Sequence, residues 1–240
     1  MDERYLSQIA VKEIFPDGQR KIESARIVVI GMGGTGTVIA ETLVRMGIGK
    51  VVIVDDDTVE LTNLARQALY EEKDVGKKKV DVAAGALRSI NSGVEIIPIP
   101  ERLTSQNARS ILSLGDVIMD ATDNYDARGI MNRVCFELRK PWVFCAVEGT
   151  FGYVKAIIPG ETSCLSCFGY PEFGSGVACT VQGVIAPAVR AVSSLAVSTA
   201  LRLLIGGRDD GDLVYIDVWK NVMDSIPIPR NPECRVCGRK

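Results

Sequence analysis

The sequence of 240 residues contains no histidine. A Ser-His-Asp triad, a Cys-His pair, a histidine metal ligand and a histidine general base are therefore excluded within this chain. Any chemistry must come from aspartate, glutamate, lysine, arginine, cysteine and the backbone amides. Net charge is also nearly absent, at −2, so no general attraction to nucleic acid or to an anionic membrane is expected.

Long apolar runs are missing as well. Residues 1–15 begin with acidic residues and contain no apolar run, so we expect no signal peptide. The longest apolar stretch, 184–205, is interrupted by Arg190 and Arg202, and we expect a buried helix rather than a membrane span. Seven cysteines without an export signal favour metal binding over disulfides. We therefore expect a cytoplasmic location.

Strand and helix signals alternate over the first 150 residues. Strands are predicted at 25–30, 51–54, 94–99, 117–121 and 142–146, and helices at 37–46, 77–90, 105–114 and 126–139. This rhythm is typical of an α/β fold with a Rossmann-like, doubly wound, mostly parallel sheet.

The pattern changes after residue 149, where strands are predicted at 153–158 and 213–218 on either side of a helix near 186–205. No linker rich in proline, glycine or serine divides the chain. We expect one domain over 1–240, with a nucleotide-binding half (1–150) and an embellished C-terminal half (151–240) on the substrate side.

A glycine turn follows the first strand and reads Gly31-Met32-Gly33-Gly34-Thr35-Gly36. Its glycines let the backbone approach phosphate oxygens, and the following helix offers its N-terminal amides to an anion. Asp55, at the end of the next strand, fits the residue that holds a ribose hydroxyl, and Asp57 follows it. A NAD-dependent dehydrogenase, or a turn that serves only helix–strand packing, would show the same pattern.

The segment after the second strand favours a triphosphate, because it contains Asn63, Arg66 and Gln67. A dehydrogenase needs no such cluster, whereas attack at phosphorus requires cations that offset the moving charge. Lys79, at the start of the next helix, could reach the same phosphates.

Acidic residues follow the strand at 117–121. Asp120 and Asp123 stand where a doubly wound sheet places its ligands, and Asn124 comes next. Magnesium takes hard oxygen ligands, so either aspartate is a candidate ligand. An aspartate in this position is also often just a helix cap.

Four of the seven cysteines form two C-x-x-C pairs about seventy residues apart. Four thiolates close the coordination shell of a structural zinc ion, which would fasten the C-terminal tail to the body of the fold. The alternative is four ordinary thiols. The candidate zinc ligands are Cys164, Cys167, Cys234 and Cys237.

The remaining cysteines differ in their surroundings. Cys179 follows a glycine-rich stretch at 173–176 and is a candidate reactive thiol, although nothing local guarantees the lowered pKa that reactivity requires. Cys135 and Cys145 stand inside a predicted helix and a predicted strand, and we expect both in the core.

Taken together, these motifs resemble the ThiF/MoeB/HesA family, whose members are relatives of the ubiquitin-activating enzymes. The resemblance runs from Arg4-Tyr5-Leu6-Ser7-Gln8 through the glycine turn, Asn63-x-x-Arg66-Gln67, Gly76-x-x-Lys79, Asp120-x-x-Asp123-Asn124, Cys164-x-x-Cys167 and Cys179 to Cys234-x-x-Cys237. It implies a homodimeric adenylyltransferase that binds ATP with Mg²⁺ at the glycine turn. A substrate carboxylate would attack the α-phosphate, releasing pyrophosphate and forming an acyl-adenylate.

The resemblance also implies roles for individual residues. Asn63, Arg66 and Lys79 would stabilise phosphate charge, and Asp123 would organise Mg²⁺. The expected nucleotide-binding residues are Gly31, Gly33, Gly34, Gly36, Asp55, Asp57, Gln67 and Asn124. The loop cysteine that matches Cys179 forms a persulfide or thioester in some members and is dispensable in others.

One position departs from the family. Its N-terminal motif commonly reads Arg-Tyr-x-Arg-Gln, and the second arginine reaches the partner subunit's ATP site, but Ser7 stands there in this chain. Either another cation, such as Lys12 or Arg20, takes its place, or the grip on phosphate is weaker.

Several substrates and roles remain open on the sequence. The resemblance implies the C-terminal glycine of a ubiquitin-fold sulfur-carrier protein, serving molybdopterin, thiamine or tRNA thiolation. A small-molecule carboxylate, as in peptide-antibiotic or iron-guanylylpyridinol cofactor pathways, is the alternative. The intact Asn63, Arg66, Lys79 and Asp123 argue against a silent scaffold, and an oxidoreductase fits least.

Overall fold

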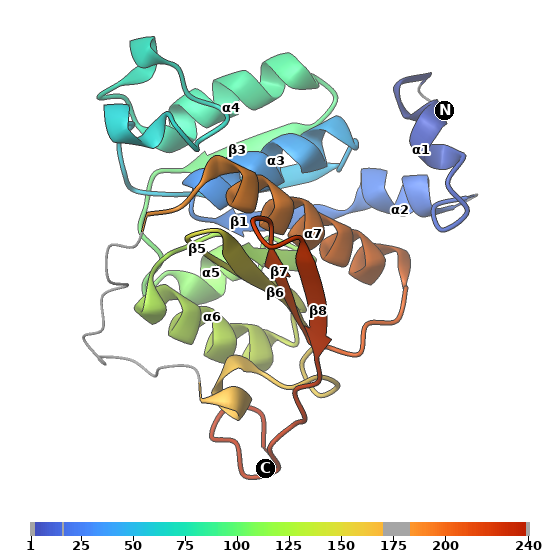
Figure 1. The fold of residues 1–240 in the computed structure, drawn as a ribbon. Helices are drawn as coiled ribbons and strands as arrows, with labels where there is room; N and C mark the ends of the chain where they lie inside the picture. The colour runs from blue at the N-terminus through green and yellow to red at the C-terminus, as the bar shows by residue number, and fades with distance from the viewer. Residues whose placement is uncertain (1–2, 16, 170–182, 239–240) are drawn as a thin grey trace.

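The computed structural model describes residues 3–15, 17–169 and 183–238. Within them, one eight-stranded sheet runs in the order β3-β2-β1-β4-β5-β6-β7-β8 (Figure 1). The first five strands along the chain pair in parallel, and β6, β7 and β8 add antiparallel. The predicted doubly wound, mostly parallel sheet is confirmed. The strands are Arg26–Ile30 (β1), Lys50–Val54 (β2), Glu95–Ile99 (β3), Val117–Asp120 (β4), Trp142–Glu148 (β5), Phe151–Ile157 (β6), Leu213–Asp217 (β7) and Val222–Ile226 (β8).

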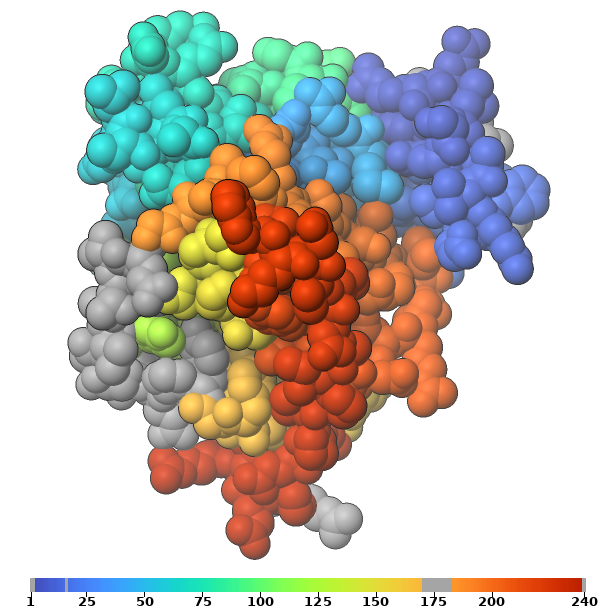
Figure 2. Space-filling view, in the orientation of Figure 1, coloured from blue at the N-terminus to red at the C-terminus, as the bar shows by residue number. Residues whose placement is uncertain are grey.

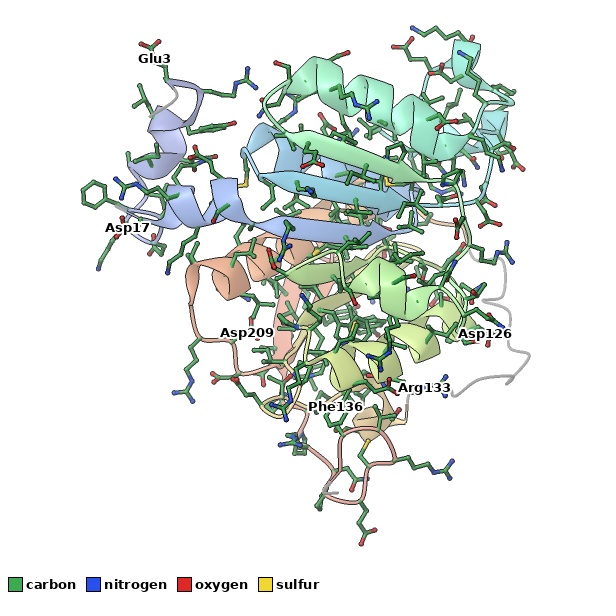
Figure 3. The ribbon with its side chains drawn as sticks, turned by 180° about the vertical axis from the view of Figure 1, so that it is seen from behind. Glu3, Asp17, Asp126, Arg133, Phe136 and Asp209 are labelled. Atoms are coloured by element: carbon green, nitrogen blue, oxygen red, sulfur yellow. The ribbon has the colours of Figure 1, made fainter. Side chains whose placement is uncertain are left out.

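Helices cover both faces of the sheet. α3, α4 and α7 share one hydrophobic core with the sheet, and α5 and α6 share a second core on the opposite face, which Figure 3 shows from behind. The helices are Leu6–Ile9 (α1), Gly18–Ser24 (α2), Gly34–Arg45 (α3), Lys79–Ile90 (α4), Ala108–Leu112 (α5), Tyr125–Leu138 (α6) and Ala186–Ile205 (α7). Short 3-10 turns lie at Glu3–Tyr5, Leu61–Asn63, Glu72–Asp74 and Leu165–Phe168.

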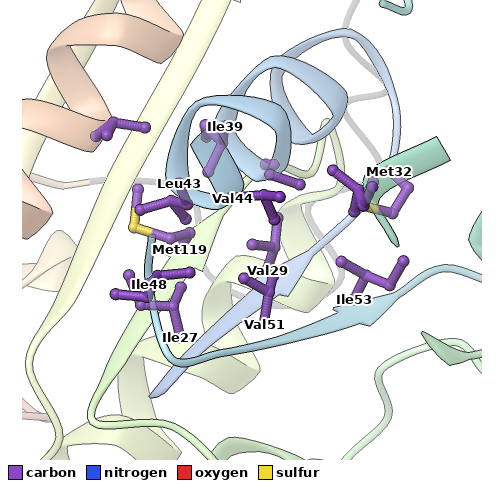
Figure 4. Packing of buried hydrophobic residues seen from close by; sticks show 14 of the residues in the cluster. Ile27, Val29, Met32, Ile39, Leu43, Val44, Ile48, Val51, Ile53 and Met119 are labelled. Carbon is purple, nitrogen blue, oxygen red and sulfur yellow. The ribbon is translucent and has the colours of Figure 1, made fainter. Parts of the chain in front are cut away.

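The central strands are apolar because both of their faces are covered. β1 reads RIVVI and β2 reads KVVIV, and all but the first residue of each is buried. Alternate side chains point to opposite faces. Ile27 and Val29 therefore pack under Ile39 and Leu43 of α3 (Figure 4), whereas Val28 belongs to the core on the α5–α6 side.

The long apolar helix α7 is a core helix. By length and composition alone, it is the one helix of the described residues that could cross a membrane. In the structure it packs against α3, β5 and β6, and its residues Ala196, Val197 and Ala200 are buried. The prediction of a buried helix is confirmed.

Several elements differ from the sequence prediction, and α1 and α2 were not predicted at all. The helix expected at 37–46 begins earlier, at Gly34, because the glycine turn itself enters the helix. The helix expected at 105–114 is confined to Ala108–Leu112, since Asn107 Oδ1 accepts the Thr104 N–H at 2.8 Å and closes a turn before it. β8 was not predicted. It reads VMDSI, all exposed, pairs with β7 at the edge of the sheet, and lies on the face of the molecule seen in Figure 2.

Two helical glycines differ in what a side chain would meet. A Cβ on Gly36 would lie 1.9 Å from the Gly31 carbonyl oxygen, whereas a Cβ on Gly85 would meet nothing within 4 Å. We expect Gly36→Ala to lower the free energy of unfolding by at least about 2 kcal/mol, because rigid backbone must move. Gly85→Ala should raise it by about 0.5–1 kcal/mol through helix propensity. Urea denaturation measures both, and equal effects would contradict this packing.

Candidate active site and zinc centre

The candidate active site lies where the strand order reverses. β1 stands between β2 and β4, and ligands of doubly wound sheets bind outside the carboxyl ends of the strands at such a point. A cleft of about 1450 Å³ opens there. Every predicted nucleotide-binding or catalytic residue lines it except Gly36: Gly31, Gly33, Gly34, Asp55, Asp57, Asn63, Arg66, Gln67, Lys79, Asp123 and Asn124.

The glycine turn is held from both sides. Gly31 has φ +92°, and a Cβ there would lie 2.7 Å from the Ala121 carbonyl oxygen, so only glycine fits. The Met32 N–H donates to Asp55 Oδ2 at 2.6 Å, and the Tyr70 hydroxyl donates to the Met32 carbonyl at 2.8 Å. Burial raises the pKa of Tyr70, which keeps its hydroxyl protonated as a donor.

The structure gives two residues at the glycine turn, Gly36 and Asp55, contacts that the sequence prediction did not include. Gly36 does not line the cleft, and its expected contact with nucleotide is replaced by close packing against Gly31. Asp55 lines the cleft, but its carboxylate already accepts the N–H groups of Met32 and Asp57. Contact of Asp55 with a ribose hydroxyl stays a prediction.

Asn63 and Arg66 both line the cleft, and Arg66 lies next to the glycine turn. Asn63 Oδ1 accepts the Glu60 N–H at 3.2 Å, which leaves the amide NH₂ group to donate. Arg66 Nη1 donates to the Thr62 carbonyl at 3.0 Å, and Arg66 Cγ lies 3.5 Å from the place a Cβ on Gly34 would take. The guanidinium is thereby held beside the backbone that would meet phosphate.

Lys79 and Gln67 are both buried at the cleft wall. The Lys79 side chain is 8% exposed, and its Nζ lies 2.9 Å from Asp57 Oδ2. Asp57 thus fixes an ammonium group at the cleft. Gln67 is 4% exposed, and its Oε1 has no hydrogen-bond partner within the described part of the chain. Gln67 therefore lies beneath the surface of the cleft.

The two aspartates after β4 have opposite surroundings. Asp120 is fully buried, and its Oδ2 accepts the Arg128 Nε–H at 2.8 Å, so the prediction that it could hold Mg²⁺ is wrong. Burial raises the pKa of Asp120, and the charge of Arg128 and the hydrogen bonds from Thr122 oppose that rise. Asp123 is exposed in the cleft and supplies the hard oxygen that Mg²⁺ prefers.

Asn124 serves as a helix cap. Its Oδ1 accepts the N–H groups of Asp126 at 2.8 Å and Ala127 at 3.1 Å, which caps α6. The cap uses only the Oδ1 atom of Asn124, so its amide NH₂ group takes no part in capping. Contact of Asn124 with a nucleotide stays a prediction.

The sequence prediction missed two groups of cleft residues. One follows β3, and its position at a strand's carboxyl end was a signal that could have found it. The other, on the antiparallel part of the sheet, has no local signal because it depends on how β6 and β7 pair. The missed residues include Arg102, Thr104 and Gln106 after β3, and Phe144, Glu148, Tyr153 and Leu213 on the strands; Arg128, on α6, was also missed.

The four predicted zinc ligands converge. Their sulfur atoms all lie within 4.8 Å of one another. Cys164 and Cys234 are 3.5 Å apart, Cys167 and Cys237 are 3.3 Å apart, and Cys164 and Cys167 are 3.9 Å apart. Tetrahedral zinc with bonds of about 2.3 Å requires sulfur separations of about 3.8 Å. The cluster could hold zinc.

One of the four cysteines, Cys234, has a lowered pKa. Burial acts to raise the pKa of Cys234, but backbone N–H groups of Cys237 and Val236 lower it, so that its pKa is about 7. A thiol that ionises near neutral pH suits zinc, which binds the thiolate.

Other predictions have separate outcomes. Cys135 and Cys145 are buried, which confirms them as core residues, and burial raises the pKa of both thiols. Cys179 lies outside the described residues. Ser7 is exposed on α1, and Arg4 Nη1 lies 3.5 Å from the Ile90 carbonyl oxygen. The homodimer and the cation that would replace an arginine at Ser7 stay predictions.

Comparison with known proteins decides the family, since the ThiF family model matches residues 5–236. The chain belongs to the ThiF family. It is 38% identical to the sulfur carrier protein ThiS adenylyltransferase of Bacillus subtilis (strain 168), with 100% of this chain and 73% of the relative covered. It is 33% identical to the SAMP-activating enzyme E1 of Haloferax volcanii, with 98% and 88% covered.

Solved structures agree on the fold. MccB of E. coli, solved with MccA-N7isoASN, superposes with a TM-score of 0.84 at 23% identity, covering 92% of this chain and 69% of MccB. At that identity, the likeness concerns the fold alone. The named relatives and the family model, rather than this structure, make the chain an ATP-using adenylyltransferase of the ThiF/MoeB type.

A zinc ion in the cysteine cluster would tie residues 227–238, which form no helix or strand, to the 3-10 turn at Leu165–Phe168. We predict one zinc per chain in the purified protein. Cys234→Ser should lose the metal and lower the free energy of unfolding by about 2 kcal/mol, or roughly 5 °C in Tm. Elemental analysis and thermal denaturation measure these.

The matched control is Cys135→Ala, a buried cysteine of α6 outside the cluster. It should lower Tm by leaving a cavity while keeping one zinc per chain. A wild-type protein that contains no zinc, or Cys234→Ser that keeps it, would contradict the zinc assignment.

Proposed function

We propose that the protein adenylates the C-terminal glycine of a ubiquitin-fold sulfur-carrier protein, using ATP and Mg²⁺. Among relatives that match nearly the whole chain, the names specify ThiS in Bacillus subtilis, a SAMP in Haloferax volcanii and a sulfur carrier protein in Thermus thermophilus. The observation that carries the proposal is that Asn63, Arg66 and Lys79 line the same cleft as the glycine turn.

The chemistry suits a site without histidine. A carboxylate is ionised at neutral pH and needs no general base. Its oxygen forms a bond to the α-phosphorus of ATP, the bond from that phosphorus to the bridging oxygen breaks, and pyrophosphate leaves with the electron pair. Charge moves but no proton does, so positioned cations carry the rate.

Each cation has a part in this scheme. Arg66, beside the glycine turn, and Lys79, paired with Asp57, would offset charge on the phosphates, and the Asn63 amide would donate to a phosphate oxygen. Asp123 is the residue that would hold magnesium. A bound magnesium ion neutralises phosphate charge and orients the leaving group.

The second wall of the cleft supports a carrier tail as the acceptor. Beyond the nucleotide residues, the cleft continues along Phe144, Glu148, Tyr153 and Leu213, on β5, β6 and β7. A cleft of this length has room for an extended tail beside a nucleotide. We further propose a cytoplasmic homodimer with a structural zinc ion, and expect neither nucleic acid nor membrane as a partner.

The decisive assay measures pyrophosphate release with ATP and Mg²⁺ against two panels of acceptors. One holds ubiquitin-fold carriers ending in Gly-Gly, and the other holds small carboxylates from cofactor pathways. Release with a carrier supports the proposal and makes Ser7 a tolerated departure. Release with a small carboxylate alone refutes the carrier assignment, and the family chemistry then serves a cofactor pathway.

Two neighbouring lysines at the start of α4 allow a test of the proposed phosphate site. Lys79 lines the cleft at 8% exposure, whereas Lys78 lies outside it with its Nζ near the Asp56 carbonyl oxygen. Lys79→Ala should reduce the rate of adenylation by about 100- to 1000-fold, because charge at phosphorus loses a fixed cation. Lys78→Ala should stay within about twofold of wild type. Comparable losses in both variants would remove Lys79 from the site.

A further inference from the structure

A buried ion pair lies directly behind Asp123. Asp120 at the end of β4 is 0% exposed and Arg128 on α6 is 4% exposed, with Nε and Oδ2 2.8 Å apart. The proposed adenylation scheme uses neither residue. Arg128 nevertheless lines the cleft.

The guanidinium of Arg128 joins three elements. Besides the carboxylate of Asp120, its Nη2 donates to the carbonyl oxygens of Thr122 and of Cys145, the latter at 2.9 Å. Its Cζ lies 5.1 Å from the centroid of the Phe144 ring. One planar fork therefore fixes α6, the end of β4 and the middle of β5 relative to one another, which a lysine cannot do.

The loop that carries Asp123 is tied at both ends. Asp120 Oδ1 accepts both the N–H and the hydroxyl of Thr122, at 3.0 and 2.8 Å, and the Cys145 thiol donates to the Asp120 carbonyl at 2.8 Å. At the other end, Asn124 caps α6. Asp123 lies between these fixed points.

A buried ion pair is weak evidence for stability, because desolvation offsets the attraction between the charges. Its directional hydrogen bonds specify one arrangement of the groups around it, and one of these groups, Thr122, belongs to the loop that carries Asp123. We propose that the Asp120–Arg128 pair positions Asp123 to hold magnesium with the nucleotide. Arg128 is thus a positioning residue, and the inference rests on the proposed role of Asp123.

The test measures the affinity of the zinc-loaded protein for ATP by calorimetry without an acceptor, once with Mg²⁺ and once with excess EDTA, keeping the chelation step short enough to leave zinc in place. Arg128→Lys keeps the charge and loses the fork. It should weaken binding of Mg·ATP about tenfold, as loss of an outer-shell partner commonly does. Binding of ATP without Mg²⁺ should change less than about twofold.

Asp123→Asn gives the largest expected change, because it removes the proposed ligand itself. In this variant, Mg²⁺ should no longer alter the affinity for ATP. Arg109→Lys is the matched control, since Arg109 pairs with Glu137 of α6 at 2.6 Å in an exposed position. It should bind Mg·ATP as wild type does. Normal Mg·ATP affinity in Arg128→Lys, alongside a loss in Asp123→Asn, would overturn this inference alone.

A second variant separates positioning from stability. Asp120→Leu combined with Arg128→Met replaces the pair with apolar side chains, a change that often preserves the stability of a fold. Zinc content and thermal denaturation show whether it is folded. A folded double variant should still bind Mg·ATP weakly, and wild-type affinity would overturn the inference. If the wild-type protein binds ATP with the same affinity with and without Mg²⁺, the proposed role of Asp123 is refuted, and this inference is refuted with it.

Discussion

The site depends on one close contact between the end of β1 and the start of α3. The Gly31 carbonyl oxygen occupies the space where a Cβ on Gly36 would be, 1.9 Å from that position. Only a glycine allows the helix to come so near the strand. The first N–H groups of α3, which have no partners within the helix, are thereby directed at the cleft together with the positive end of the helix dipole. The same turn presses Gly31 against Ala121, so the ends of β1 and β4 form one wall.

The cations of the cleft are placed before any substrate arrives. Arg66 is held by a carbonyl oxygen and Lys79 by the carboxylate of Asp57. An ammonium group at 8% exposure would be costly to bury without that partner. Because the partner is an exposed carboxylate at the rim, the charge stays available to a phosphate. Because the chain has no histidine, the proposed catalysis would depend on this arrangement of fixed charges.

Much of this was predictable from local patterns. The strands from β1 to β5 follow from apolar runs between helical segments, and the cysteine cluster follows from two C-x-x-C pairs, a spacing typical of metal sites. The two aspartates after β4 could not be told apart in the same way. Both stand at one strand end, and only the packing of Arg128 from α6 makes one a buried structural group and leaves the other open. β8 was not predicted for a related reason. Its VMDSI sequence has no wholly apolar face, and it is a strand because it pairs with β7.

The sheet changes from parallel to antiparallel pairing at β5, and this change divides the cleft into two sides. β5 contributes to both walls of the cleft, because Cys145 bonds to the end of β4 while the whole strand pairs with β6. On the parallel side, the described contacts of the glycine turn and of the Asp120–Arg128 pair involve no residue of β6, β7 or β8. The cysteine cluster belongs to the same hydrophobic core as Trp142 and Phe144 of β5. If the proposed phosphate site is right, substitutions along β6 to β8 would change the other side of the cleft and leave Arg66 and Lys79 in place.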